Sequence, residues 1–265
     1  MKTNYDRHML AVCGDSGSGK STLSKVISAY LVNSTVVECD RYHKWERGDS
    51  SWKTFTHLNP EANHLSLMNG DALILKSGLP VFRREYDHST GTFTEDQLIN
   101  PSKNIVMCGL HTFYDVEDLY NLKIFMETDK ELKTQWKIAR DSNKRGYSTS
   151  EVKEQIRIRQ TDYNKFLKPK AKDADLIVNF RSDVGAVNAA KGIGRSLRIF
   201  VRDTYDIKGI LAKFKEDGAE ILNPLSSRPG FFELNVETYR QIDKNYYYDY
   251  IMVCILDLLI QCVKN

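Results

Sequence analysis

Short runs of apolar residues alternate along this chain with longer segments in which apolar residues recur every three or four positions. The short runs have the length and composition of strands buried on both faces, and the longer segments have the period of amphipathic helices. Because strands and helices alternate, the pattern predicts an α/β fold in which helices cover both faces of a mostly parallel sheet. The predicted strands are His8–Cys13, Thr35–Cys39, Asn104–Cys108, Leu122–Thr128 and Asp175–Phe180, and the predicted helices are Lys20–Leu31, Pro60–Lys76, Lys130–Arg145 and Thr149–Leu167.

The pattern changes after about residue 181. The segments that follow are short and separated by turn residues, which predicts antiparallel strands added to the sheet and closed by a C-terminal helix. No linker composition separates two domains, so we expect a core at residues 1–194 and a C-terminal extension of the same domain at residues 195–265. The predicted additions are strands at Arg195–Val201, Ala219–Leu222 and Phe231–Leu234 and a helix at Val236–Val263.

Residues 14–22 have the sequence GDSGSGKST, which fits the phosphate-binding loop G-x-x-x-x-G-K-[ST] at every fixed position. The loop follows a predicted strand and opens a predicted helix, so backbone N–H groups and the helix dipole can hold phosphate oxygens. This context predicts a P-loop NTPase-type sheet that binds a nucleoside triphosphate, with Lys20 on the β- and γ-phosphates and the Ser21 hydroxyl on Mg²⁺. The residues expected at the nucleotide are Gly14, Asp15, Ser16, Gly17, Ser18, Gly19, Lys20, Ser21 and Thr22.

Composition and charge limit the partners and the cellular compartment that we expect for this protein. The net charge is +3, which is too small to predict binding to nucleic acid. The polar N-terminus is unlike a signal peptide, and the apolar run Tyr250–Cys262 is too short to span a bilayer and carries Asp257. The five cysteines have no metal-binding spacing, so reduced thiols are expected. We therefore expect a cytoplasmic protein without a membrane or nucleic-acid partner, and edge strands after residue 195 could pair across a homodimer.

A carboxylate follows the second predicted strand at Asp40. Ligands of α/β sheets bind at the carboxyl ends of parallel strands, so Asp40 is the predicted catalytic base for an acceptor hydroxyl. It could also bind Mg²⁺, directly or through water. The alternative is an aspartate that only caps a turn.

One predicted helix carries a group of charges at spacings of three and four. Lys137, Arg140, Asp141 and Arg145 would therefore share one helix face. Arginines there can bind phosphate oxygens and neutralise the charge that develops in phosphoryl transfer. The alternative is a solvated face with ordinary surface ion pairs.

These motifs together resemble phosphoribulokinase, within the phosphoribulokinase/uridine kinase superfamily of P-loop kinases. The matches follow the family order over about residues 8–180. The P-loop and the R-D-x-x-x-R-G of the charged helix are shared with uridine kinases, whereas the D-x-x-H-x-x-x-R of Asp40, His43 and Arg47 favours the phosphoribulokinase branch. Further matches are THLNPEAN (56–63), YDHSTG (86–91), GLHTFYD (109–115), WKIARDSNKRG (136–146) and RQTDYNKF (159–166).

The resemblance implies a kinase that uses ATP and Mg²⁺ and phosphorylates a small sugar phosphate, D-ribulose 5-phosphate or a related pentose phosphate. A uridine, nucleoside or other small-metabolite kinase of the superfamily is the alternative. The implied catalytic residues are Asp40, Lys20, Lys137 and Arg140. Arg140 and Arg145 would also lie near the transferred phosphate, and Asp40 and Ser21 would bind the metal. The implied acceptor residues are His43, Arg47, Tyr86, His88, His111 and Arg159, while His8, His57 and His64 have no expected role.

The chain departs from the family at Cys108, immediately before G-L-H, where the family has an acidic residue, normally Glu. A thiol is a poor ligand for Mg²⁺, which prefers oxygen. Either Glu38, Asp40 or Asp141 supplies the missing carboxylate, or the chain is a weakened kinase or a nucleotide-binding protein. Because the other charged positions are present, we expect an active enzyme.

Overall fold

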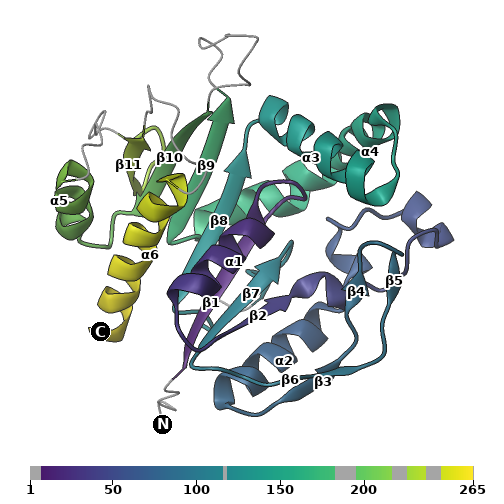
Figure 1. Ribbon diagram of the computed structural model, residues 1–265, viewed down its shortest axis with the longest axis horizontal. Coiled ribbons are helices and arrows are strands. Elements are labelled where there is room, and N and C mark those ends of the chain that lie inside the picture. Colours follow the sequence, from purple (N-terminus) through teal and green to yellow (C-terminus); the bar gives the residue numbers. More distant parts are fainter. Residues whose placement is uncertain (1–6, 116–117, 183–194, 217–225, 237–245, 265) are drawn as a thin grey trace.

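A seven-stranded sheet forms the centre of the computed structural model, which describes residues 7–115, 118–182, 195–216, 226–236 and 246–264. The strand order is β11-β10-β9-β8-β1-β7-β2 (Figure 1). The five strands from β9 to β2 are parallel, and β10 and β11 each run antiparallel to the preceding strand, which confirms the predicted α/β fold. The strands are β1 (His8–Gly14), β2 (Ser34–Glu38), β7 (Asn104–Gly109), β8 (Leu122–Thr128), β9 (Leu176–Ser182), β10 (Arg195–Arg202) and β11 (Phe231–Val236).

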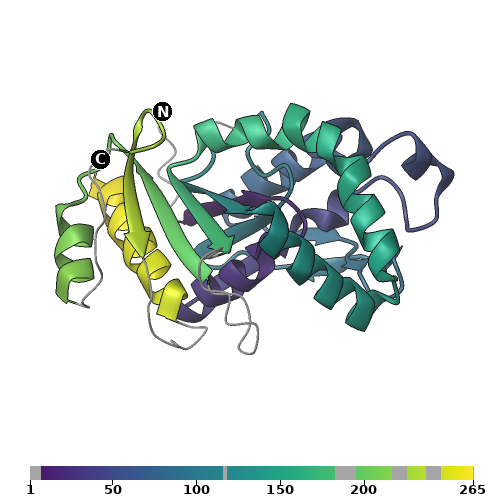
Figure 2. The same cartoon turned by 90° about the horizontal axis from the view of Figure 1, so that it is seen from above.

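Alternating side chains of the strands build one apolar core on each face of the sheet. Leu10 and Val12 of β1 face the core shared with α1 and α6, whereas Met9 and Ala11 face the core shared with α2. Figure 2 shows helices on both sides of the sheet. The helices are α1 (Lys20–Tyr30), α2 (Leu65–Ser77), α3 (Lys130–Arg145), α4 (Thr149–Asp162), α5 (Lys208–Glu216) and α6 (Tyr246–Lys264).

Two predicted helices are interrupted. The segment predicted as Pro60–Lys76 is a 3₁₀ turn at Pro60–Ala62 followed by α2, because Asn63 is extended and pairs with the backbone of His43. The segment predicted as Thr149–Leu167 leaves the α-helix after Asp162 and continues as a π-turn. At Asn63, the long-range pairing with His43 overrides the local helical pattern.

Specific end signals fix α3 and α4 at that end of the sheet (Figure 1). Asp129 accepts a hydrogen bond from the Leu132 N–H at 2.8 Å and starts α3 directly after β8. Gly146 ends α3 with a φ of +73°, and Ser148 starts α4 in a capping box with Glu151. The short connection keeps the two helices against each other.

The C-terminal part extends the sheet as predicted. The strands predicted near residues 195 and 231 are β10 and β11, and the predicted final helix is α6, although residues 237–245 and the predicted strand Ala219–Leu222 lie outside the described residues. The short helix α5 was not predicted, although its buried residues Ile210 and Phe214 lie one helical turn apart. No helix within the described ranges is long and apolar enough to cross a membrane.

Two small antiparallel strand pairs lie on the α2 side of the molecule (Figure 1). They are β3 (Val81–Arg83) with β6 (Gln97–Ile99) and β4 (Tyr86–Asp87) with β5 (Thr92–Phe93).

The packing of α6 on the sheet gives a matched test. Ile255 is fully buried and Ile260 is 54% exposed on the same helix. Ile255→Ala should lower the free energy of unfolding by about 3 kcal/mol, because it leaves a cavity in the core. Ile260→Ala should change it by less than about 0.5 kcal/mol. Urea denaturation of both variants measures the difference, and equal losses would contradict this packing.

Candidate active site

The glycine-rich loop lies between the end of β1 and the start of α1, as the sequence predicts. At Gly14 a Cβ atom would lie 2.6 Å from the Met126 carbonyl oxygen, so no larger residue fits without a shift of backbone. Gly19 has a φ of +95°, which residues with side chains rarely adopt. Lys20 Nζ donates to the Asp15 carbonyl oxygen at 2.9 Å and so lies over the loop. Backbone N–H groups in this compact arrangement can surround phosphate oxygens.

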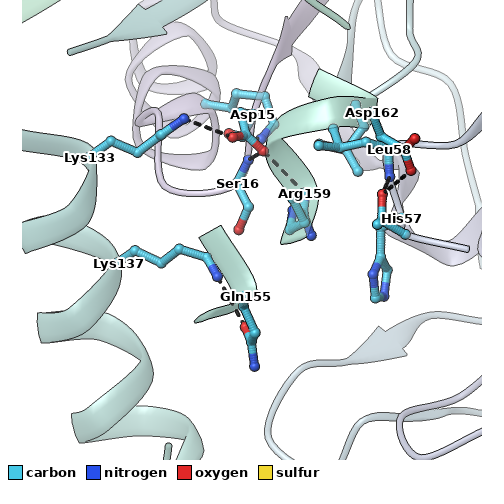
Figure 3. Close-up of polar contacts among 12 residues, drawn as sticks. Asp15, Ser16, His57, Leu58, Lys133, Lys137, Gln155, Arg159 and Asp162 are labelled. Atoms are coloured by element: carbon cyan, nitrogen blue, oxygen red, sulfur yellow. Dashed lines mark hydrogen bonds and ion pairs between the residues drawn. The ribbon is translucent and has the colours of Figure 1, made fainter. Parts of the chain in front are cut away.

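The Asp15 carboxylate ties the P-loop to the helices beside it (Figure 3). Its Oδ2 lies 3.0 Å from Lys133 Nζ, and its Oδ1 lies 3.2 Å from Arg159 Nη2 and 2.6 Å from the Ser16 N–H that donates to it. Burial disfavours the charged carboxylate, but the cations Arg159 and Lys133 outweigh it and lower the pKa of Asp15. The structure therefore places Arg159 at the donor loop, whereas the resemblance implies an acceptor role for it.

The charged face of α3 surrounds a second buried carboxylate. Asp141 is 1% exposed and lies 2.7 Å from Arg140 Nε, 3.3 Å from Arg145 Nη1 and 3.6 Å from Lys137 Nζ. Arg140 also donates through Nη2 to the Ser16 hydroxyl at 3.1 Å. The ion pairs foreseen for a solvated helix face are present, but they are buried against the P-loop.

Burial changes the acid–base behaviour of Lys137. Desolvation, with the neighbouring charges of Arg159 and Arg140, lowers the pKa of its ammonium group to about 8, although Asp141 opposes the shift. Its positive charge is therefore sensitive to pH just above neutrality.

One face of α4 connects three parts of the site (Figure 3). Gln155 accepts a hydrogen bond from Lys137 Nζ at 3.1 Å, and Arg159 follows one turn later at the P-loop. Asp162 accepts a hydrogen bond from the Thr56 hydroxyl at 2.8 Å, at the start of the loop that leads to α2. Helix α4 thus holds the P-loop, the charged helix α3 and this loop in one arrangement.

The predicted base Asp40 lies in a 3₁₀ turn, Cys39–Tyr42, that follows β2. Its Oδ2 lies 3.0 Å from His88 Nε2, and its Oδ1 lies 3.5 Å from His43 Nε2. Burial opposes ionisation, but the hydrogen bond from His88 and the charges of His43, His88 and Lys20 hold the pKa of Asp40 well below its usual value. Asp40 is therefore an ionised hydrogen-bond acceptor within electrostatic reach of Lys20.

A buried carboxylate behind this turn fixes its position. Asp71 of α2 accepts a hydrogen bond from the Tyr42 hydroxyl at 2.9 Å. Arg83 of β3 binds the same carboxylate through Nε at 2.5 Å and Nη2 at 2.7 Å. Because all three groups are held together, the turn that carries Asp40 cannot move independently of α2 and β3.

Imidazole and aromatic rings pack beside Asp40. His43 is 3% exposed, and its Nδ1 lies 2.7 Å from Asn63 Oδ1. The centroid of its ring lies 5.7 Å from that of Tyr86 and 4.6 Å from that of His57. His57 stacks on Trp52 at 3.8 Å. Burial lowers the pKa of both histidines, and that of His57 falls well below its usual value. The sequence analysis gave His57 no role, yet the fold packs its ring against His43.

Two other predicted acceptor residues are engaged by backbone carbonyls. His111 is buried with Nε2 3.3 Å from the His57 carbonyl oxygen, and burial lowers its pKa to about 4. Arg47 donates to the carbonyl oxygens of His88 at 2.6 Å and Ser89 at 3.3 Å. Arg47 thus holds the turn that presents His88 to Asp40.

Cys108 lies beside Glu38 in the register of β7 and β2 and is buried. Burial raises the pKa of its thiol, and Glu38, Asp40 and Lys20 are its charged neighbours. The thiol is thus protonated and does not suit Mg²⁺.

Oxygen donors that could hold Mg²⁺ lie at the P-loop and at the end of β2. Over the described part of the chain, no group of three or more His, Cys, Asp and Glu side chains could hold a metal ion by itself. Mg²⁺ commonly uses one or two carboxylates with substrate phosphates, and the candidates here are the Ser21 hydroxyl, Asp40 and Glu38.

Several polar residues of the site had no role in the sequence analysis, among them Lys133, Gln155, Asp162 and Asn63. Lys133 precedes Lys137 by one helical turn, and this spacing could have added it to the charged face of α3. Asn63 ends the matched segment THLNPEAN, but only the fold brings its neutral amide to His43.

Comparison with known proteins assigns a family. The model of the phosphoribulokinase / uridine kinase family matches residues 9–186. Phosphoribulokinase of Synechocystis sp. is 33% identical over 183 residues, which cover 67% of this chain and 55% of that protein. Chloroplastic phosphoribulokinase of Arabidopsis thaliana is 31% identical over 191 residues, covering 64% of this chain and 48% of that protein. The chain spans about half the length of these curated relatives.

A uridine kinase and a solved structure complete the comparison. Uridine kinase of Latilactobacillus sakei is 28% identical over 177 residues, covering 64% of this chain and 84% of that protein. The structure of phosphoribulokinase from Rhodobacter spheroides matches this chain with a TM-score of 0.70 and 20% sequence identity, and the match covers 99% of this chain and 100% of that chain. At this identity the match supports the fold alone. By the family match over most of its length, the chain belongs to the phosphoribulokinase/uridine kinase family.

Proposed function

We propose that this protein is an ATP-dependent kinase that transfers the γ-phosphate to a hydroxyl of a phosphorylated sugar, D-ribulose 5-phosphate or a related pentose phosphate. The observation that carries the proposal is the ionised Asp40, which is bordered by His43 and His88 and lies within electrostatic reach of Lys20. The relatives named phosphoribulokinase support the choice of acceptor.

Asp40 would accept a hydrogen bond from the reacting hydroxyl and receive its proton as the new P–O bond forms. A carboxylate with a low pKa is a weak base, so it orients the hydroxyl in the ground state. Proton transfer then comes late, which suits the loose transition state of phosphoryl transfer. His88 would keep the carboxylate aligned through its hydrogen bond.

Three cations would neutralise the charge on the transferred group. Lys20 lies on the P-loop, Arg140 donates to the Ser16 hydroxyl, and Lys137 lies between Asp141 and Gln155. Their partners already hold them in place, so little reorganisation is needed during transfer. Mg²⁺, held by Ser21 and Asp40 with Glu38 nearby, would supply further charge neutralisation at the phosphates.

The same proposal covers the partners, the compartment and the oligomeric state of the enzyme. The acceptor is a small molecule, and we propose a cytoplasmic protein. A homodimer could form along β11, which is the outermost strand of the sheet among the described strands.

Turnover across acceptors tests the function directly. ADP formation should depend on a pentose phosphate, and Asp40→Asn should lower kcat about a thousandfold while ATP affinity stays within about threefold. Asp49→Asn, at an exposed turn, is the matched control with parental activity. Turnover of uridine in place of every pentose phosphate would instead select a nucleoside kinase.

The low pKa of Lys137 predicts a pH dependence. Its charge is present below pH 8 and is lost above it, so kcat/KM for ATP should fall as pH rises through about 8. Lys137→Arg keeps its charge at high pH and should remove this decline. An identical decline in the arginine variant would assign it to another group.

A nucleotide-binding protein with weakened catalysis is the second candidate, and the buried thiol of Cys108 is the observation that favours it. For an active enzyme served by Glu38 and Asp40, Cys108→Glu should leave kcat within about threefold of the parent. A gain of about tenfold or more, absent in the Cys108→Ser control, would select the weakened protein.

A further inference from the structure

Three aromatic rings gather beside the start of α1. Trp136 of α3 and Tyr248 of α6 both approach Gly19, where a Cβ atom would lie 3.9 Å from Trp136 Cζ3 and 4.0 Å from the Tyr248 hydroxyl oxygen. Phe180 of β9 packs against both, with its ring centroid 5.7 Å from that of Trp136 and 6.1 Å from that of Tyr248. Phe180 is buried, whereas Trp136 and Tyr248 are partly exposed. We call these three side chains the aromatic platform.

The strand order places the aromatic platform and Asp40 on opposite sides of the P-loop. The loop follows β1, which has β8 and β9 on one side and β7 and β2 on the other. Phe180 belongs to β9, and α6 contacts β8 and α1 on the same side (Figure 1). Asp40 follows β2 on the other side. A triphosphate in the loop with its γ-phosphate toward Asp40 therefore has its nucleoside toward the platform.

Helix α3 also presents different side chains to the two ends of the loop. Arg140 Nη2 donates to the Ser16 hydroxyl at 3.1 Å, near the beginning of the loop. Trp136 lies about one helical turn earlier and approaches Gly19, where the loop ends and α1 begins. A cation at one end suits phosphate oxygens, and an aromatic ring at the other end suits a nucleoside base.

We propose that the aromatic platform binds the base of the donor nucleotide by stacking, and that this base is a purine. A purine offers two fused rings to an aromatic face and therefore gains more from stacking than a pyrimidine. The inference rests on the proposed function, because the direction of the triphosphate follows from transfer toward Asp40. Since Tyr248 belongs to α6, the C-terminal extension completes the donor site.

Inorganic tripolyphosphate is a probe that has the phosphates of ATP without the nucleoside. Isothermal titration calorimetry of the full chain with Mg²⁺ should show that Trp136→Ala raises the Kd for ATP about tenfold and leaves the Kd for tripolyphosphate within about twofold. Tyr248→Ala should raise the Kd for ATP about threefold, again without an effect on tripolyphosphate. Intact binding of tripolyphosphate shows that the P-loop is folded in each variant. Equal losses for both ligands, or a loss for neither, would overturn the inference.

Two further variants separate stacking from general effects of losing a large ring. Trp136→Phe keeps an aromatic face, so its Kd for ATP should stay within about threefold of the parent. Trp45 is also partly exposed, but it stacks on Phe55 at 5.6 Å in the segment that follows His43. Trp45→Ala is the matched control and should leave the Kd for ATP within about twofold. A Trp136→Phe variant as weak as Trp136→Ala would contradict stacking.

The identity of the base has its own test. The parent should bind ATP about tenfold more tightly than CTP, and Trp136→Ala should lower this ratio to about threefold or less. An unchanged ratio would overturn the contact with the base. These titrations need no acceptor and no turnover. Selective binding of ATP without phosphorylation of any pentose phosphate would reject the proposed function and keep the platform, whereas turnover with a platform-independent Kd for ATP would do the reverse.

Discussion

The ion pairs of Asp15 with Lys133 and Arg159 join the P-loop to α3 and α4, and the rest of the site depends on them. A carboxylate in a buried position is stable only when cations surround it, so the loop and both helices must come together. The same helix face carries Gln155 and Asp162, whose contacts reach α3 and the loop that begins at Thr56. The P-loop, α3 and the loop that begins at Thr56 are therefore parts of one polar network.

A second shared carboxylate, Asp141, gathers positive charge beside the P-loop. The buried Asp141 carboxylate pairs with Lys137, Arg140 and Arg145, so three positive groups lie close together. Burial lowers the pKa values of Lys137 and Arg145, and neighbouring cations add to the shift, so positive charge is disfavoured at this site before any phosphate binds. Phosphate oxygens would relieve the repulsion among these cations, and this gives a physical reason for affinity to a triphosphate.

The surroundings of Asp40 combine one anionic group with neutral imidazole rings. Asp40 is ionised, while burial keeps His57 and His111 neutral. The surroundings of Asp40 thus present hydrogen-bond acceptors and aromatic rings, whereas the P-loop lies beside cations. In the proposed reaction, the hydroxyl group would meet the first set and the phosphoryl group would meet the second.

The sequence by itself determined the P-loop, the parallel strands around it and the ends of α3, because these depend on contiguous residues such as the Gly14–Thr22 segment and Asp129. It also singled out Asp40 and the charged face of α3 through spacing. Only the tertiary structure decided that Arg159 binds the P-loop, that His57 packs on His43, and that Asn63 is hydrogen-bonded to that ring. These contacts join residues far apart along the chain. No local pattern specifies them, since they follow from how β2, α2 and α4 meet at the carboxyl end of the sheet.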